Sequence, residues 1–574
     1  MSIAYKLKTT LLLFLVIICF SLHAQDIIQT RQYPKDFFRY PLDLPPTTAG
    51  SFGELRANHF HAGLDFKTNQ AIGIPLHAVA DGYVSRLKVQ FGGFGNAVYI
   101  THPNGYTSVY GHLSRFAPGL AKIIRDTQYK QQSFEVDINL QPMQIPVCKD
   151  QVFAWSGNAG ASAGPHLHFE MRDVNTQETI NPQLFGLTIR DKVPPAITSL
   201  YVYHLNGEPF SELTPKEYHQ VAGSNGKYHL APAPVLALNG QIGFGIGAYD
   251  MNSTSMNHNG VYSIRLSVDG KPVFTFAVED FAFDQTHAIN AIIDYPLHLT
   301  TGREIQKSFI LPGNKITVFP QSVNRGLISF TDDDVHEVAY EVKDVAGNMA
   351  TLAFKVKSSS KPPVIMPKPA GTLFKYNQRN EFNAPGIKVV VQPGNLYDDL
   401  NFIYSASAMR PGAYSVVHHV HNRFTPIHDT YELSIKPDAP LGANAGKAVI
   451  YNLAGGSEGG TFDGEYVKTN ARGFGNFEIR IDTIPPRLTP LNIHDGANLS
   501  AVKTIHFQVS DNLSGLKTYN GKIDGKWVLV EWDYKTRLLN YTFDENITPG
   551  KHVFDLVVGD NKSNFTQYTA NFYR

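Results

Sequence analysis

Residues 164–170 read Gly-Pro-His-Leu-His-Phe-Glu, a pattern typical of a β-strand with one face turned into a core. In a strand, residues two apart project from the same face, about 6.6 Å apart along the chain. His166 and His168 can therefore address one point, while Leu167 packs into the core behind them. The stretch predicts a strand that carries polar chemistry on one side.

The surrounding segment, from about Gly50 to Gly186, consists of short strand-like stretches divided by Gly and Asn turns. Residues 96–100 and 106–110 are two such stretches, and residues 102–105 (His-Pro-Asn-Gly) predict a tight hairpin turn between them. No long segment shows helical periodicity. We therefore expect residues 50–187 to form a β domain.

A second histidine cluster lies about a hundred residues earlier, where residues 59–65 read His-Phe-His-Ala-Gly-Leu-Asp. Extended chain would separate His61 and Asp65 by roughly 13 Å, which is too far for two ligands that each lie about 2 Å from one metal ion. Gly63 permits the bend that would bring them together. Two His and one Asp leave a zinc ion one position for water, and zinc lowers the pKa of that water to about 7.

The order His-x-x-x-Asp followed by His-x-His resembles the lysostaphin-type (LytM-like) zinc peptidases, which cleave peptidoglycan peptides. The likeness covers roughly residues 52–186. Further stretches between the two clusters are similar to that family, namely residues 80–84, 93–96, 110–114 and 162–165.

The resemblance implies the roles of individual residues. One zinc ion is expected to bind His61, Asp65 and His168, with His166 as the general base. His112 becomes a second catalytic histidine, which either orients the water or stabilises the oxyanion. The insertion at residues 117–145 is longer than the family's usual connection and could form a wall or lid of the groove, so substrate preference stays open.

Other polar residues near these motifs have simpler interpretations. Arg56 could meet a peptide carboxylate or form a structural ion pair. His59 is expected to lie beside His61 without contacting substrate or metal. Residues 418–421 (His-His-Val-His) lack a nearby carboxylate and are not expected to bind metal. Residues 331–334 (Thr-Asp-Asp-Asp) could hold calcium but are better explained as a solvated acidic loop. Cys148 is expected to be a small buried residue rather than a nucleophile.

The second half of the chain contains one pattern twice. Asp-x-x-Pro-Pro occurs at residues 191–195 and again at 482–486, and two further landmarks recur in the same order, at 268–271 and 523–526 and at 342–348 and 558–564. The repetition predicts two related modules, residues 191–357 and 482–574. Alternation such as that of residues 261–268 fits β-sandwich strands, and the Asp-x-x-Pro-Pro start resembles immunoglobulin-like modules of bacterial surface proteins.

The region between these modules begins with a linker at residues 358–363, whose composition is Ser, Lys and Pro. Residues 364–481 are again strand-like and are interpreted as a third β-sandwich. The expected fold class is therefore all-β: an N-terminal β-rich zinc peptidase domain followed by about three immunoglobulin-like modules.

The N-terminus indicates the compartment. A basic start, an apolar run at residues 11–20 and a small residue at Ala24 describe a signal peptide, residues 1–24, followed by an N-terminal segment, residues 25–49. We expect an exported protein of the periplasm, cell envelope or extracellular space, with no membrane span after signal removal. Lys+Arg and Asp+Glu are equal at 50 each, so no net charge favours nucleic acid.

The sequence thus predicts an exported zinc endopeptidase that hydrolyses amide bonds in peptidoglycan stem or cross-link peptides. Two alternatives stay open: a non-catalytic LytM-like regulator of another wall hydrolase, and a secreted protease that acts on proteins. The β-sandwich modules could bind an envelope protein partner. Which peptide bond is cleaved does not follow from the sequence.

Overall fold

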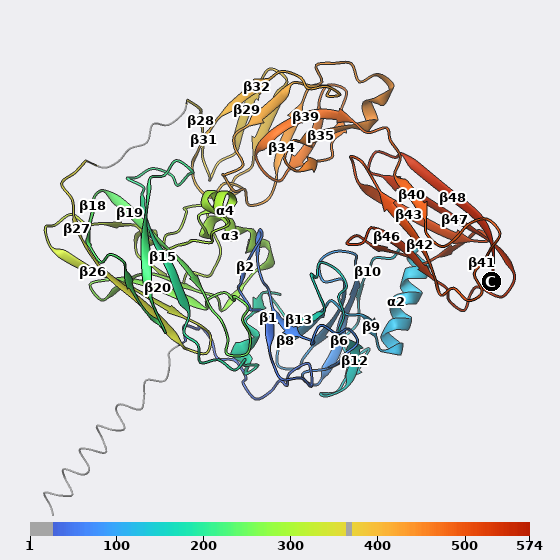
Figure 1. Ribbon diagram of the computed structural model, residues 1–574, viewed down its shortest axis with the longest axis horizontal. Helices are drawn as coiled ribbons and strands as arrows, with labels where there is room; N and C mark the ends of the chain where they lie inside the picture. The colour runs from blue at the N-terminus through green and yellow to red at the C-terminus, as the bar shows by residue number, and fades with distance from the viewer. Residues whose placement is uncertain (1–26, 363–369) are drawn as a thin grey trace, which may run out of the picture.

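The computed structural model describes residues 27–362 and 370–574, in which strands far outnumber helices (Figure 1). The predicted all-β fold class is confirmed. The predicted signal peptide, residues 1–24, lies outside the described residues. Within the two described ranges, none of the helices combines the length and the apolar composition needed to cross a bilayer.

The N-terminal domain is built on one antiparallel sheet with the order β1-β4-β13-β8-β7-β6-β10. Its strands are β1 Thr48–Gly50, β4 Leu64–Lys67, β13 His166–Asp173, β8 Tyr106–Gly111, β7 Asn96–Thr101, β6 Gly82–Val89 and β10 Val136–Asn139. A small second sheet contains β5 Pro75–His77, β12 Val152–Trp155 and β9 Arg115–Phe116. A short hairpin, β2 Leu55–Arg56 and β3 His59–Phe60, stands apart from both.

Strand β13 lies in the middle of the main sheet, between β4 and β8. Leu167 and Phe169 are completely buried on its core face, as the strand pattern predicted. The tight turn between β7 and β8 forms at residues 102–105, where Gly105 adopts a positive φ of 85°. That conformation costs glycine little because it has no Cβ.

One helix in this domain was not predicted. α2, Pro118–Gln131, occupies the first half of the insertion at residues 117–145. Its buried residues Leu120, Ile124 and Gln128 form a single narrow stripe at intervals of four, and one of the three is polar. The expectation that no long segment is helical was wrong because so narrow a stripe gives a weak periodic signal.

Cys148 is exposed, so the expectation of a buried cysteine was also wrong. Residues 147–153 do not form one strand. The chain turns after β11, Pro146–Val147, with Asp150 at a φ of 72°, and then enters β12 in the other sheet. The alternation of a single strand therefore does not apply to Cys148.

The first C-terminal module forms a 12-stranded sheet that folds back on itself, so that Phe244 of β19 packs on Phe354 of β27 with ring centroids 5.4 Å apart. Its principal strands are β15 Ala196–His204, β16 Lys216–Ser224, β17 Lys227–Leu230, β19 Gln241–Tyr249, β20 Ser263–Val268, β21 Lys271–Ala277, β26 Val335–Lys343 and β27 Met349–Ser358. Three short helices, η2 Phe283–Ala288, α3 Ile289–Ile292 and α4 Tyr295–Thr301, interrupt it after β21.

Each of the remaining two modules has two main sheets that enclose a separate hydrophobic core, and the middle module adds a two-stranded sheet of β28 Thr372–Phe374 and β31 Leu400–Phe402. In the middle module the sheets are β29 Asn380–Ala384, β30 Ile387–Val391, β34 Tyr431–Ile435, β38 Val467–Ala471 and β37 Thr461–Phe462, and β32 Tyr404–Ser407, β33 Val417–Val420, β39 Gly475–Ile481, β35 Ala448–Asn452 and β36 Gly456–Ser457. In the C-terminal module they are β40 Arg487–Pro490, β42 Thr504–Ser510, β46 Leu538–Thr542 and β45 Val530–Asp533, and β41 Ala497–Asn498, β48 Phe565–Tyr573, β47 Lys551–Asp560, β43 Leu516–Ile523 and β44 Lys526–Val528.

The N-terminal domain and the first module share one continuous core. Phe60 and Phe52 of the N-terminal domain pack on Phe281 of the module, with ring centroids 5.6 and 5.0 Å apart. The mutual burial of these aromatic side chains fixes the two parts against each other.

The C-terminal module returns to the N-terminal domain at the other side, beside α2 (Figure 1). Tyr129 of α2 packs edge-on against Trp527, with ring centroids 5.2 Å apart, and Arg125 pairs with Glu545 at 3.3 Å. Lys535 donates from Nζ to the carbonyl of Asn158 at 2.6 Å. The chain therefore closes into a ring in which three modules follow the N-terminal domain and the last contacts it.

Candidate metal centre

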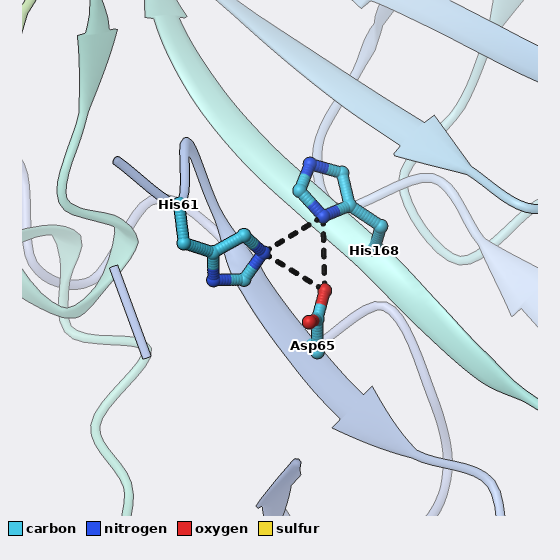
Figure 2. Close-up of side chains that lie close together, drawn as sticks. All are labelled: His61, Asp65 and His168. Atoms are coloured by element: carbon cyan, nitrogen blue, oxygen red, sulfur yellow. Dashed lines mark hydrogen bonds and ion pairs between the residues drawn. The ribbon is translucent and has the colours of Figure 1, made fainter. Parts of the chain in front are cut away.

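Three side chains from two separate segments meet on the face of the main sheet (Figure 2). Nε2 of His61 lies 3.0 Å from Oδ1 of Asp65 and 3.0 Å from Nδ1 of His168, and these last two atoms are 2.9 Å apart. All three residues are buried. Three donor atoms therefore converge on one point.

Strand pairing explains the convergence. β4 and β13 are antiparallel neighbours, and their register places Asp65 opposite His168. His61 comes from the irregular segment between β3 and β4, where the chain bends at Gly63. A Cβ at Gly63 would lie 2.3 Å from the carbonyl oxygen of Phe169, so the bend needs glycine because the two backbones approach closely.

The donor set fits zinc. Two imidazole nitrogens and one carboxylate oxygen are ligands that zinc prefers, and three protein ligands leave a fourth position open. Ligands about 2.0–2.2 Å from a tetrahedral ion lie roughly 3.4 Å apart, so the observed separations need to widen by only a few tenths of an ångström. The three side chains are already arranged as a zinc site requires.

Each of the three side chains is held by a second hydrogen bond. Nδ1 of His61 donates to the carbonyl of Ser51 at 2.7 Å, and Nε2 of His168 donates to Oε1 of Glu170 at 2.8 Å. Arg56 donates from Nη2 to Oδ2 of Asp65 at 2.6 Å. Such outer partners fix the tautomer and orientation of metal ligands, and here they leave one lone pair of each ligand facing the centre.

Arg56 therefore forms the structural ion pair that was one of its two expected roles. Glu170 was not assigned a role from the sequence, although its spacing of two from His168 places it on the same strand face. It is completely buried and bonded to Arg172 at 2.7 Å. The parity of the strand could have revealed it.

Electrostatics support a preformed ligand set. Burial would raise the pKa of Asp65, but His61 and hydrogen bonds from His166 and His168 hold it well below its ordinary value. Burial opposes protonation of His168, yet Asp65 and Glu170 outweigh burial and raise its pKa to about 9. Without a metal ion, a proton on His168 thus supplies the positive charge between the carboxylates of Asp65 and Glu170.

The two further histidines lie beside the cluster. The ring of His112 lies 4.8 Å from that of His166 and 5.7 Å from that of His168, between ring centroids. Nδ1 of His112 donates to the carbonyl of Ala159 at 2.7 Å, and Nδ1 of His166 donates to that of Gly164 at 2.8 Å. Nε2 of His166 lies 3.4 Å from Oδ1 of Asp65, so its free nitrogen faces the centre.

His112 has two features that the sequence does not reveal. It directly follows β8 and has a φ of 60°, a left-handed conformation that costs a non-glycine residue free energy and is concentrated at functional sites. Burial, with the nearby charges of His168 and His166, lowers its pKa to about 3. The imidazole is therefore neutral near pH 7.

The other histidines considered from the sequence lie elsewhere. His59 is exposed, and its Nδ1 donates to the carbonyl of Ala57 at 3.0 Å. His419 bonds to Asn476 at 2.7 Å, and His421 to Thr425 at 2.9 Å. His102, expected in a turn, is in fact buried and bonded to Asp81.

Replacing Glu170 with glutamine is expected to weaken zinc binding about 10–100-fold, as for other outer partners of metal ligands. The amide has one acceptor oxygen for two donors, His168 and Arg172, so the imidazole loses its fixed tautomer. Competition with a chelator of known affinity measures the change, with Glu178→Gln, at a partly buried glutamate outside the cluster, as control. Unaltered zinc affinity in Glu170→Gln, with native unfolding behaviour, would contradict the prediction.

In comparisons with known proteins, two regions of the chain match family models. Residues 59–129 match Peptidase family M23, and residues 371–482 match a Zu5-like domain. The N-terminal region is 35% identical over 128 residues to the DD-carboxypeptidase/endopeptidase Mpg of Neisseria meningitidis, covering 22% of this chain and 23% of that protein. It is 29% identical over 153 residues to the peptidoglycan DD-endopeptidase ShyC of Vibrio cholerae, covering 24% and 28%.

An uncharacterized metalloprotease of Haemophilus influenzae is 32% identical over 142 residues, covering 24% of this chain and 25% of that protein. The chain thus spans about a quarter of the length of the curated relatives it matches. Among solved structures, the catalytic domain of lysostaphin from Staphylococcus simulans is 23% identical and covers 25% of this chain and 93% of that one, with a TM-score of 0.18.

Proposed function

We propose that this chain is an exported zinc endopeptidase that hydrolyses amide bonds in peptidoglycan stem or cross-link peptides. Its N-terminal domain is of the Peptidase family M23 type, as the lysostaphin-like motifs predicted. The observation that carries the proposal is the convergence of His61, Asp65 and His168 within 3.0 Å of one another. The relative named peptidoglycan DD-endopeptidase ShyC supports the substrate class.

In this proposal His61, Asp65 and His168 hold one zinc ion. The ion would supply polarisation of the scissile carbonyl and a lowered pKa of water. Ser51, Arg56 and Glu170 keep the three ligands in place, as described above. No covalent intermediate with the protein is needed.

His166 is the proposed general base. Its Nδ1–H is committed to the carbonyl of Gly164, so Nε2 is the ring nitrogen that can take a proton from the attacking water. It is also the most exposed of the cluster, with 14% of its side chain accessible against 3–6% for the three metal ligands. Substrate can therefore reach it.

His112 is proposed to orient the water. Its Nδ1–H is committed to the carbonyl of Ala159, which leaves Nε2 of the neutral ring as a hydrogen-bond acceptor. An acceptor can hold a water molecule but cannot donate to an oxyanion. Of the two roles expected from the sequence, the first is favoured.

The alternatives make different demands. A non-catalytic regulator would not require the three ligands, His112, His166 and their outer partners. All of these residues are present here. A protease that acts on proteins would need the same site, so only substrate tests separate it from a wall hydrolase.

Digestion of purified peptidoglycan sacculi tests the proposal. The mature protein is expected to release peptide-containing fragments, identifiable by mass, and to lose this activity when a chelator removes zinc and regain it when zinc is restored. Casein serves as the protein substrate. Fragment release that is insensitive to zinc removal would overturn the zinc mechanism, and cleavage of casein alone would overturn the substrate class.

A further inference from the structure

Three aspartates of the first module lie together away from the zinc site. Asp250 follows β19, Asp344 follows β26, and Asp191 belongs to the Asp-x-x-Pro-Pro motif. One carboxylate oxygen of each lies within 4.8 Å of the others. Asp250 and Asp344 are buried and Asp191 is partly buried, so three acidic groups meet in a site that is largely shielded from water.

The aspartates line a small cavity of about 30 Å³, which is also lined by Asn259. The Oδ1 atoms of Asp250 and Asn259 are buried and have no hydrogen-bond partner among the described residues. Asp250 is 6% exposed and Asn259 is 5% exposed. A buried polar atom without a partner destabilises the folded state, and two such atoms beside one cavity point to a ligand that would satisfy them.

The two residues are held against each other by their backbones. The amide of Asp250 donates to the carbonyl of Asn259 at 2.9 Å, and the amide of Asn259 donates back at 2.8 Å. Burial and the charges of Asp344 and Asp191 raise the pKa of Asp250 to about 8. The cluster therefore carries acidic groups whose mutual repulsion a cation would relieve.

We propose that Asp191, Asp250, Asp344 and Asn259 bind one calcium ion. All the available donors are oxygens, which hard cations prefer, and calcium accepts irregular sets of carboxylate and amide oxygens at 2.3–2.6 Å. One oxygen of each aspartate lies within 4.8 Å of the others, so the three are no farther apart than oxygens on opposite sides of such an ion, which are separated by roughly 4.6–5.2 Å. The smaller magnesium ion demands closer and more regular ligands.

The site lies at the junction with the peptidase domain. Thr48 and Ser51 line the same cavity, Asn252 donates to Oγ1 of Thr48 at 2.9 Å, and Gly260 donates to Oγ of Ser51 at 3.0 Å. The carbonyl of Ser51 holds His61. The calcium ion is thus a structural ligand that stiffens the junction next to the zinc site and takes no part in the reaction.

A similar trio occurs in the C-terminal module, where Asp482, Asp511 and Asp560 hold the matching positions of the repeat. There, the charges of Asp482 and Asp560 already act on the ammonium group of Lys562, so this trio has a cation of its own. The assignment is therefore restricted to the first trio.

Equilibrium dialysis of the zinc-loaded full chain against calcium-45, at about 1 mM CaCl2 as for extracellular modules, tests the proposal. Asp250→Asn is expected to bind one calcium ion fewer per chain than the parent protein, whereas Asp333→Asn, in the exposed acidic loop of the same module, binds as many as the parent. Asparagine has nearly the same shape as aspartate, so both variants are expected to keep the fold.

Thermal unfolding gives a second readout that does not depend on peptidase activity. CaCl2 is expected to raise the unfolding midpoint of the parent and of Asp333→Asn but not that of Asp250→Asn. Equal calcium binding by the parent and Asp250→Asn would overturn the site. Displacement of calcium-45 by MgCl2 that is as complete as displacement by the same concentration of unlabelled CaCl2 would overturn the choice of calcium.

Discussion

Replacing His61 with alanine is expected to remove zinc from the protein and to reduce fragment release from sacculi to background. His61 supplies one of the three side-chain donors that converge at the centre, and its loss leaves two ligands for an ion that requires at least three from protein at a catalytic site. The loss of zinc affinity should exceed the roughly 10–100-fold cost of changing an outer partner.

Metal content by mass spectrometry and digestion of sacculi measure the two effects. His59→Ala is the matched control, because His59 lies two residues away but is exposed and bonded to the backbone of Ala57. It should keep both zinc and activity. Retention of a full equivalent of zinc by His61→Ala would show that the ion binds elsewhere.

The second large effect separates catalysis from metal binding. His166→Ala is expected to retain zinc while its kcat falls about 10²–10⁴-fold, the usual contribution of a general base. The reason lies in the number of ligands: His61, Asp65 and His168, whose ligand atoms lie within 3.0 Å of one another, supply the three protein ligands that a catalytic zinc ion needs. The ion can thus be held without His166.

Zinc content and kcat must be measured on the same preparation. His419→Ala, which changes a histidine in the middle module, controls for nonspecific effects of losing an imidazole. If zinc and activity disappeared together in His166→Ala, His166 would be a ligand rather than a base. If activity persisted, another group would take the proton.

Much of the site follows from short stretches of sequence. The spacing of two between His166 and His168 predicted a shared strand face with Leu167 in the core, and β13 has that form. The bend at Gly63 was predicted from the distance that extended chain would span. Both predictions depend only on local backbone geometry, which a few residues specify.

Other features were misjudged because local pattern is a weak guide to them. The buried stripe of α2 is one residue wide, and Cys148 lies where one strand-like run divides between two sheets. Glu170 had the right parity to be noticed, but its importance comes from Arg172 and from complete burial. Burial depends on neighbours that are distant in sequence.

The sequence by itself therefore determined the all-β class and the residue types of the candidate metal site. Only the tertiary structure decided that Asp65 faces His168 across β4 and β13, that Arg56 and Ser51 hold the ligands, and that the C-terminal module contacts α2. The physical reason is one of range. Strand periodicity is set by neighbouring residues, whereas pairing register and docking are set by packing between segments a hundred or more residues apart.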